Sequence, residues 1–382
     1  MIKVKSETIS WDQGPTGTTS YDLLINGTKK SSTKSALQAG FALSEGDVVK
    51  VVAQPSGQSQ EIKVDWTVTG STTPVPVPFD KTFDAAKDGD FNAFWNTLLP
   101  GMRVGLKGTI TPTGSINHGG AAGKLITVAP LDMSNLPVVQ GYFDCRENFQ
   151  YTLWDHVRFV DTEANPHSND WAFGGSYNEF LNCEITNNGI NKIGINAIWD
   201  NTYGMAVSNK WTQCYIHDIG DLTHWTAADY YSGGYNTIQG YYDMGKSNIV
   251  QDCLIIRCCA RGLQCRGGNG GIYRYNIVAG CGEGVNIGED GAVNNLYTKN
   301  IIANCHVPNR NLIELFDPNN LAVGNKADDN IIWGGAADAS TPGRLDITNL
   351  RIIDPMFNAS YKPQNAAVAG YGPRNWPALA PA

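Results

Sequence analysis

The sequence has few charged residues and no long apolar runs. Only 17% of its 382 residues are Asp, Glu, Lys or Arg, against about 25% in an average soluble domain. Its net charge of −8 argues against nucleic acid as a partner, since broad binding to nucleic acid needs excess positive charge. No apolar run reaches the ~18 residues of a membrane span, so we expect no membrane insertion. The first residues also lack a signal peptide's apolar core. We therefore expect an extracellular protein whose leader was removed, or a virion-associated one.

The sequence also lacks cysteine pairs at the spacing of metal ligands, and its only adjacent pair is Cys258-Cys259. All nine cysteines lie between Cys145 and Cys305, and no CxxC motif occurs. Structural zinc sites need Cys and His ligands at close spacing, so the sequence does not indicate one. A disulfide framework is equally unsupported, and we expect buried, reduced thiols.

What is abundant is glycine, with 42 residues, together with short β-favouring segments. Residues 1–70 contain such segments at 8–11, 21–25, 46–52 and 62–68. Short strands at this spacing predict a small β-sandwich. Alternating prolines in 71–79 then predict a semi-rigid linker. The segments ISWDQGPTGTTSYDLLING and GDVVKVVA resemble a fibronectin type III module.

The rest of the chain, 80–382, opens with a short amphipathic stretch at 90–99 that Pro100-Gly101 ends. A β-favouring segment at 103–108 follows directly. A helix placed before the first strand predicts the N-terminal cap of a stacked-repeat fold, where an open sheet edge would otherwise recruit other chains.

A repeated β-segment dominates this region, with a minimum spacing of 23 residues from Cys253 to Asn276. A second in-register column lies five residues past each anchor. The anchors are Val157, Cys183, Cys214, Cys253, Asn276, Asn300 and Asn330, and the second column is Thr162, Asn188, Ile219, Cys258, Cys281, Cys305 and Gly335. Such a period marks stacked repeats, and strand-rich units without helical periodicity predict a parallel β-helix.

Two details resemble right-handed parallel β-helices of the pectate-lyase type. Asn276, Asn300 and Asn330 are spaced to form a ladder of amides at a bend. The ending Ile353-Asp354-Pro355-Met356-Phe357, followed by 366–370, resembles the terminal segment of these proteins. The predicted fold class is therefore all-β, a right-handed parallel β-helix with a small N-terminal β-sandwich.

The segment 246–274 has a charge unlike the rest of the chain. It contains five basic residues and one acidic residue, Asp252. Arginine binds carboxylates and sulfates bidentately, so the cluster predicts an anionic polysaccharide as partner, with Arg257, Arg261 and Arg274 as substrate-binding candidates. The alternative is that these are solvated, outward positions on coils that happen to be basic.

Lys246 lies seven residues before anchor Cys253, and Arg266 lies ten before anchor Asn276. Their spacing places them on neighbouring coils, one step of ~4.8 Å apart with at most three residues of lateral offset. Both side chains could then reach a single sugar.

Residues 245–278 resemble the catalytic coils of the alginate lyase and chondroitin B lyase family of polysaccharide lyases. The resemblance implies β-elimination, with Lys246 as the base at C5 of a uronate and Arg266 as the group that neutralises charge. Where the family often has His after this Arg, the sequence has Gly267. The family often binds Ca²⁺ just upstream of the Lys, where only Asp243 is a candidate ligand here, so a metal-independent enzyme stays open.

An aromatic loop at 220–243 interrupts the repeat before Lys246. Exposed aromatic rings can pack on sugars, or the loop can pack its aromatics on the coil below. The substrate-binding candidates here are His224, Trp225, Tyr230 and Tyr241. His217 and His224 are also acid–base candidates, although a structural hydrogen-bonding role is the commoner one.

Carboxylates offer a second chemistry, since a pair of acids can hydrolyse a glycosidic bond. The candidates are Asp218 with Asp221, Glu283 with Glu289 and Asp290, and Asp317. We predict a polysaccharide lyase acting on a uronate-containing, alginate-like polymer. The alternatives are a glycoside hydrolase and a non-catalytic carbohydrate-binding protein of the phage tailspike type.

Overall fold

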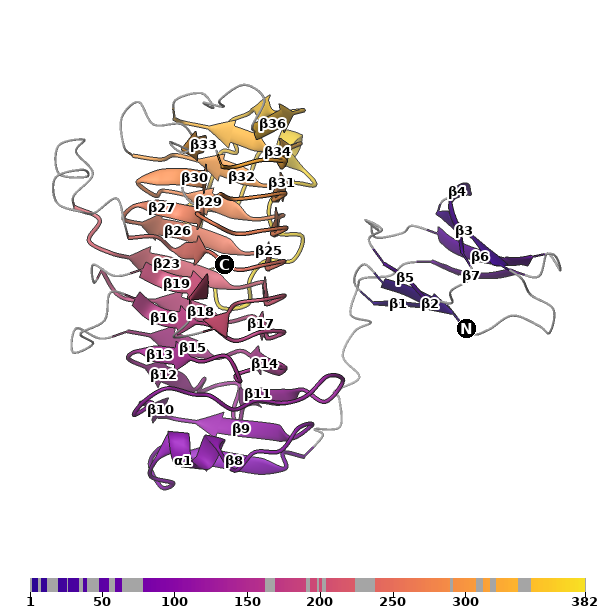
Figure 1. Cartoon of the computed structure of the whole chain (residues 1–382). Coiled ribbons are helices and arrows are strands. Elements are labelled where there is room, and N and C mark those ends of the chain that lie inside the picture. Colours follow the sequence, from indigo (N-terminus) through magenta and orange to yellow (C-terminus); the bar gives the residue numbers. More distant parts are fainter. Residues whose placement is uncertain are drawn as a thin grey trace. The chain divides into compact units, whose positions relative to one another are not determined.

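The structure is a computed structural model in which the chain divides into two compact units, Met1–Val77 and Pro78–Ala382 (Figure 1). In the first unit it describes 2–5, 8–11, 20–25, 27–33, 37–39, 48–54 and 59–63; in the second it describes 78–381 apart from 162–168, 190–192, 198, 201–203, 224–237, 289–290, 307–311, 317–320 and 336–344. Most of the expected linker, 71–77, lies outside these residues.

The N-terminal unit contains two antiparallel sheets. One has the order β1 (Ile2–Lys5), β2 (Thr8–Trp11), β5 (Leu37–Ala39), and the other the order β4 (Thr28–Thr33), β3 (Ser20–Ile25), β6 (Val48–Gln54), β7 (Ser59–Lys63). Leu23 and Ile25 are buried, while Asp22 and Leu24, which alternate with them, are half-buried; this is the period of a strand with one covered face. The strands expected at 8–11 and 21–25 are present, and β6 covers most of 46–52. Residues 64–68 of the expected strand 62–68 lie outside the described residues, and the fibronectin type III assignment stays a prediction.

The second unit is a right-handed parallel β-helix, as the sequence predicts, built from three long parallel sheets. The first sheet contains β8 (Lys81–Asp84), β9 (Arg103–Lys107), β11 (Ile126–Pro130), β14 (Thr152–Asp155), β17 (Glu179–Leu181), β22 (Lys210–Thr212), β25 (Ile249–Gln251), β28 (Ile272–Arg274), β31 (Leu296–Thr298), β34 (Asn325–Asp328) and β36 (Leu345–Thr348).

The second sheet contains β10 (Thr109–Ile110), β12 (Val138–Gln140), β15 (Arg158–Val160), β18 (Glu184–Thr186), β23 (Tyr215–Ile219), β26 (Leu254–Cys258), β29 (Ile277–Ala279), β32 (Ile301–Ala303), β35 (Ile331–Trp333) and β37 (Arg351–Ile352). The third contains β13 (Phe143–Cys145), β16 (Asn169–Phe173), β19 (Ile193–Ala197), β24 (Tyr241–Asp243), β27 (Arg261–Cys265), β30 (Glu283–Gly288) and β33 (Ile313–Phe316). From β11 to β33 each coil visits the three sheets in this order. A two-stranded hairpin of β20 (Trp199–Asp200) and β21 (Gly204–Met205) follows β19.

The predicted anchor column is confirmed. Each anchor immediately precedes a strand of the second sheet, and those strands pair in register from Arg158 with Glu184 up to Ile301 with Ile331. The second column follows the same register where Ile219 pairs with Cys258. The repeated anchor residues therefore mark, on successive coils, the turn that leads into the second sheet.

The predicted asparagine ladder is present. Asn276 Nδ2 donates to Asn300 Oδ1 at 3.0 Å, and Asn300 Nδ2 donates to Asn330 Oδ1 at 3.0 Å. All three side chains are buried, and each amide also donates to a backbone carbonyl of the coil below. A second asparagine ladder, which was not predicted from the sequence, lies at the turn that leads into the first sheet. Its lower part contains Asn178, Asn209 and Asn248. Gly271 takes the next position, and Asn295 and Asn325 continue the ladder on the following coils.

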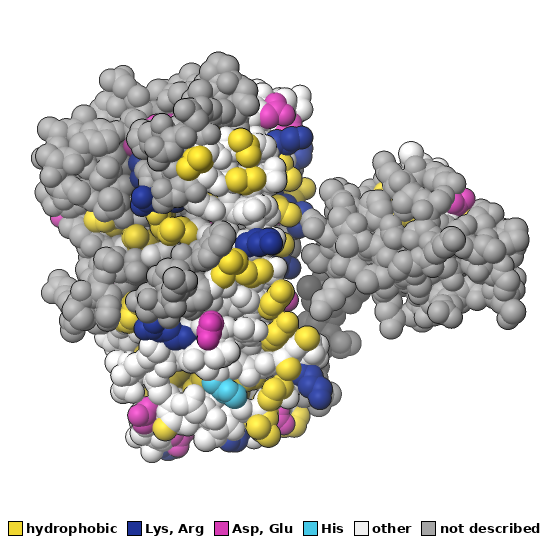
Figure 2. All heavy atoms as spheres, in the orientation of Figure 1, with side chains coloured by type: hydrophobic (Ala, Val, Ile, Leu, Met, Phe, Trp, Pro, Cys, Tyr) yellow, Lys and Arg dark blue, Asp and Glu magenta, His cyan; other side chains and the backbone are white. Residues whose placement is uncertain are grey.

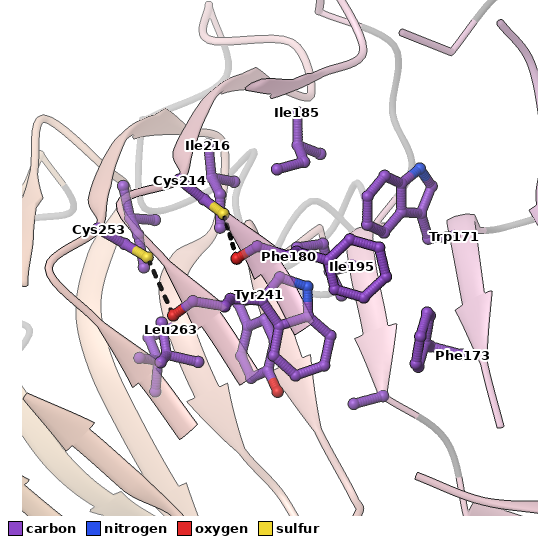
Figure 3. Packing of buried hydrophobic residues seen from close by; sticks show 14 of the residues in the cluster. Trp171, Phe173, Phe180, Ile185, Ile195, Cys214, Ile216, Tyr241, Cys253 and Leu263 are labelled. Atoms are coloured by element: carbon purple, nitrogen blue, oxygen red, sulfur yellow. Dashed lines mark hydrogen bonds between the residues drawn. The ribbon is translucent and has the colours of Figure 1, made fainter. Parts of the chain in front are cut away.

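The core is a continuous apolar column inside the three sheets. Figure 3 shows Trp171, Phe173, Phe180 and Tyr241 packed with Ile and Leu side chains, beside the thiols of Cys214 and Cys253. All nine cysteines are free, and all but the half-buried Cys305 are buried. The thiols act here as small apolar side chains, in agreement with the expectation of buried, reduced cysteines.

The expected cap is a short helix, α1 (Phe91–Trp95), at the lower end of the stack in Figure 1. Asp90 caps its N-terminus by accepting hydrogen bonds from the backbone of Asn92 and Ala93, as capping carboxylates do. Trp95 is fully buried and packs on Trp154 with ring centroids 5.2 Å apart, closing the core. Among the described residues, no helix has the length and apolar character that a membrane span requires.

The C-terminal segment, 353–381, runs back along the outer face of the second sheet. Val368 and Tyr371 pack with the outward side chains of that sheet, Leu254, Ile256, Ile277, Ile301 and Ile331, into a second apolar cluster. Arg374 ties the segment to the stack through Asp252, with Nη2 2.6 Å from Oδ2. The segment therefore seals one face of the β-helix.

Candidate functional site

The basic residues of 246–274 do not form one surface. Arg274 belongs to the first sheet, Arg257 to the second, and Arg261 to the third, while Arg266 follows the third. On the face that Figure 2 presents, Lys and Arg side chains likewise appear in several separate places. The predicted cluster therefore does not act as one binding surface, because successive basic residues lie on different sides of the same coils.

Arg257 is held in an ion-pair network on the second sheet. Its Nε lies 2.6 Å from Asp218 Oδ1, and its Nη2 lies 2.7 Å from Asp218 Oδ2. Burial alone raises the pKa of Asp218, but the hydrogen bonds from Arg257 and His217 outweigh this and hold that pKa well below its usual range. His217 completes the network through Asp218 and Glu184, at 2.6 and 3.1 Å. The expected substrate-binding role of Arg257 does not fit, since its guanidinium already has a carboxylate partner.

Arg274 and Arg261 are also occupied by protein groups. Arg274 donates from Nε and Nη2 to Gln251 Oε1, at 3.1 and 2.8 Å. Arg261 is 5% exposed, and its Nε lies 2.9 Å from Glu283 Oε2. A buried ion pair of this kind is costly to break, so Arg261 and Glu283 together are a structural pair and neither fits its expected role in binding or hydrolysis.

Lys246 and Arg266 lie on neighbouring coils, as their spacing predicts. Lys246 is exposed and lies at the turn after the third sheet, with Val207 on the coil below and Asn269 on the coil above as register partners. Arg266 follows Cys265, which pairs with Asp243, and its backbone N–H donates to the Asp243 carbonyl at 2.9 Å. Its register partner is therefore Met244, two residues before Lys246.

The two side chains differ in how they are held. Arg266 is half-buried, and its Nη1 donates to the hydroxyl of Tyr242 at 3.1 Å. For the Lys246 ammonium, the described residues provide neither a hydrogen bond nor an ion pair. Gly245 sets the backbone of this turn, since a Cβ there would collide with the Ala206 carbonyl. The arrangement combines one anchored cation with one exposed amine, which donates a proton as the ammonium and accepts one as the neutral amine.

Asp243 and Tyr241 point into the core instead of toward this corner. Asp243 is 1% exposed and accepts hydrogen bonds from Gly245, Asn248 and Tyr273 at 2.7, 3.0 and 2.7 Å. Burial raises the pKa of its carboxyl group despite these donors. Tyr241 is fully buried, as Figure 3 shows among its core neighbours. The expectation that Tyr241 binds substrate is wrong, and Asp243 does not fit a calcium ligand because its oxygens are enclosed and already hydrogen-bonded.

The described side chains around Lys246 also lack the ligands that a Ca²⁺ site needs. Ca²⁺ takes 6–8 oxygen ligands, and the described residues contain no group of three or more His, Cys, Asp or Glu side chains that could hold a metal. Gln239, upstream of Lys246, donates from Nε2 to Gln264 at 2.7 Å. The described residues around Lys246 therefore do not fit the metal site that the resemblance implies.

A polar column on the outer face of the third sheet leads to this corner, and the sequence analysis missed it. Its members are register partners on successive coils, and most are amides or acids. They are Asp144, Ala172, Asn196, Tyr242, Gln264, Asn286 and Glu314. The signal in the sequence was a polar residue between two core residues, as in Leu263-Gln264-Cys265 and Val285-Asn286-Ile287, but loops of unequal length hid the alignment.

Several candidates lie outside the described residues: His224, Trp225, Tyr230, Glu289, Asp290 and Asp317. Asp221 is described, and its Oδ1 accepts hydrogen bonds from the backbone and hydroxyl of Thr223 at 2.9 and 2.7 Å. Together with the ion pair of Asp218, this gives both acids local structural partners. Asp218 and Asp221 therefore do not form the hydrolytic pair that the sequence offered as an alternative.

Comparisons with known proteins support the fold. No protein-family description and no curated protein matches the chain. Among solved structures, pectate lyase Pel9A is similar with a TM-score of 0.52 and 14% identity, over 73% of this chain and 80% of that chain. An alginate lyase from Paenibacillus sp. str. FPU-7 aligns with a TM-score of 0.37 and 11% identity, over 71% of this chain and 99% of that chain. At this identity the likeness to the pectate lyase shows a parallel β-helix and no more.

Proposed function

We propose that this chain is a polysaccharide lyase that cleaves a uronate-containing, alginate-like polysaccharide by β-elimination. The observation that carries the proposal is the pairing of an exposed lysine, Lys246, with an anchored arginine, Arg266, on adjacent coils. The fold likeness to a pectate lyase raises the expectation for this chemistry, although fold alone does not assign function.

The two side chains match the two demands of the reaction. Lys246 Nζ, when neutral, takes the proton from C5 of the uronate, the C5 electron pair forms the C4–C5 double bond, and the C4–O bond breaks. The departing oxygen takes up a proton from the ammonium or from solvent. Arg266 stabilises the charge that develops on the uronate carboxylate, and the Tyr242 hydroxyl positions its guanidinium.

Lys246 is the member of the basic segment suited to be the base. An arginine keeps its charge at any working pH, whereas a lysine can lose its proton. No step of the proposal passes through a metal, because the described donors around Lys246 do not fit Ca²⁺.

The other parts of the prediction enter as proposals. Residues 1–70 are proposed to form a separable, fibronectin-like sandwich without a share in catalysis, and the protein is proposed to act outside the cell or on a virus particle. An N-terminal unit with its own sheets is compatible with that separation.

The test is an activity screen of the full chain on alginate, polygalacturonate and glycosaminoglycans, read at the absorbance of unsaturated uronates. The proposal predicts that absorbance rises on at least one of them. Cleavage that leaves only saturated ends would replace the lyase by a glycoside hydrolase. Binding without any cleavage would favour a carbohydrate-binding protein of the tailspike type.

A further inference from the structure

Two tyrosines form a stacked pair on the outside of the β-helix. Tyr151 and Tyr177 lie on successive coils with ring centroids 4.9 Å apart and an angle of 5° between their planes. Tyr177 is 44% exposed, and Tyr151 is half-buried. One face of the Tyr177 ring is covered by Tyr151, and among the described residues no other ring contacts Tyr177.

The pair lies on the same corner of the stack as Lys246. Gln150, which precedes Tyr151, bridges to Ser176, which precedes Tyr177. The next coil continues the column at Val207, whose carbonyl accepts the Tyr177 N–H at 2.8 Å, and Val207 bridges to Lys246. Tyr177 is therefore two coils from Lys246, about 10 Å along the stack at ~4.8 Å a coil.

The side chains become small between the pair and Lys246. The positions that correspond to Tyr177 on the next two coils are Ser208 and Ser247, each directly after a member of the column. Because the two rings stack along the column at about the coil spacing, the second face of Tyr177 is directed toward Ser208. A serine where the coils below have tyrosine leaves room there for a flat group of ring size.

Fold requirements do not account for tyrosine at these positions. Tyr151 and Tyr177 have φ values of 53° and 60°, whereas the later coils place Ser247, Gly270 and Asn294 there, with φ of 55°, 69° and 57°. The left-handed region favours Gly and Asn and is unusual for a bulky residue. Residues held in such conformations often have a functional role.

We propose that Tyr177, supported by Tyr151, is a sugar-stacking subsite that holds a pyranose ring of the polysaccharide beside Ser208, one coil before Lys246. The inference rests on the proposed function, because a sugar at Tyr177 belongs to a polysaccharide that lies along the axis of the stack and passes Lys246. Tyrosine suits this role because its ring offers a flat apolar face and its hydroxyl remains in water. Tyr177 binds substrate and takes no part in bond breaking.

The test measures binding in a protein that cannot turn its ligand over. The full chain carrying Lys246→Ala is titrated with sodium alginate, polygalacturonate and chondroitin sulfate, with and without Tyr177→Ala. Tyr177→Ala is expected to weaken binding about 2- to 10-fold, the range of one aromatic contact, and Tyr177→Phe to retain it. Trp333→Ala is the matched control, because Trp333 is also exposed, at 37%, but belongs to the second sheet. In the otherwise unsubstituted chain, Tyr177→Ala should raise KM and leave kcat unchanged.

The outcomes separate this inference from the proposed function. If Tyr177→Ala weakens binding but the unsubstituted chain yields no unsaturated product, the lyase proposal falls and the subsite stands. Product that depends on Lys246, with binding unchanged by Tyr177→Ala, overturns the subsite alone. An equal loss from Trp333→Ala, or no binding to any of the three polymers, also overturns it.

Discussion

The outer faces of the second and third sheets belong to the same coils, yet their outward side chains differ in polarity. The outward residues of the second sheet at Leu254, Ile277 and Ile301 are apolar, and the C-terminal segment covers them. At the corresponding outward positions of the third sheet stand Tyr242, Gln264 and Asn286. An apolar outer face must be covered by the protein itself, because exposing it to water is unfavourable. Tyr242, Gln264 and Asn286 are themselves buried, at 7%, 1% and 0% exposure. The third sheet's outer face therefore differs in being polar, and the exposed group beside it is Lys246.

The comparison also explains why the arginines of one segment have different roles. Arg257 on the second sheet is bound by Asp218, and Arg274 on the first by Gln251. Arg266 follows the third sheet and is oriented by Tyr242. In a three-sided stack, closeness in sequence gives closeness along the axis but not a shared face.

The largest expected effect is at Lys246. Lys246→Ala should lower formation of unsaturated product by on the order of 10²–10⁴, the range for loss of a general base, because no other described side chain at this corner can take the proton. The midpoint temperature of thermal unfolding should change little, since Lys246 is exposed. Lys326→Ala, at an exposed lysine of the first sheet, is the control and should keep full rate. Equal rates for Lys246→Ala and the unsubstituted chain would contradict the assignment of this corner.

A slightly smaller loss is expected at Arg266. Arg266→Ala should reduce kcat about 10²–10³-fold, as for other groups that stabilise developing charge. Arg274→Ala should leave kcat unchanged, because its guanidinium faces the first sheet's side and binds Gln251. Steady-state kinetics of both variants tests whether the two faces differ. If Arg274→Ala lowers kcat as much as Arg266→Ala does, the two arginines act on one surface and the comparison of the faces is wrong.

The covered face should show its role in stability instead. Ile277 is fully buried between the second sheet and the C-terminal segment, and Ile277→Ala should cost about 2–5 kcal/mol of unfolding free energy. Ile352→Ala on the same sheet should cost less than about 0.5 kcal/mol, because Ile352 is 69% exposed. Denaturant unfolding of both variants measures the difference. Equal effects would mean that the segment does not seal this face.

The smallest effect is a pH dependence from His217. Burial opposes the imidazolium, but hydrogen bonds with Asp218 and Glu184 outweigh it and raise the pKa of His217. The charged ring therefore adds stability that is full below the unfolded pKa of about 6.5 and is lost as the pH rises through the raised folded pKa. The loss is about 1.4 kcal/mol for each unit by which the folded pKa exceeds the unfolded one. Unfolding free energies of the unsubstituted chain and of His217→Gln, measured from pH 5 to pH 9, should differ in this slope, and parallel curves would contradict the assignment.

Repetition decided what the sequence could predict. The anchor column, the Asn276–Asn300–Asn330 ladder and the capping helix follow from local patterns that recur or that end a helix, and the structure contains all three. The sheet to which each arginine belongs did not follow, because it depends on residues with positive φ, such as Asp252 before β26 and Arg257 within it, at 55° and 51°. Asp and Arg carry no glycine-like signal for such a conformation.

The interior position of Asp243 was hidden for a related reason. A carboxylate before a Lys-Ser pair suggested a ligand, whereas the side chain is buried and accepts a hydrogen bond from the buried hydroxyl of Tyr273, 2.7 Å away. That contact joins residues 30 positions apart, so no local pattern could reveal it.

The central claim is that Lys246 removes a proton, and Lys246→Arg tests it most directly. Arginine keeps the positive charge at this corner but cannot act as a base at any working pH. The account predicts that Lys246→Arg forms unsaturated uronate as slowly as Lys246→Ala, while its binding to the same polysaccharide persists. If Lys246→Arg cleaves at a rate near that of the unsubstituted chain, position 246 supplies only charge, and the assignment of Lys246 as the base is wrong.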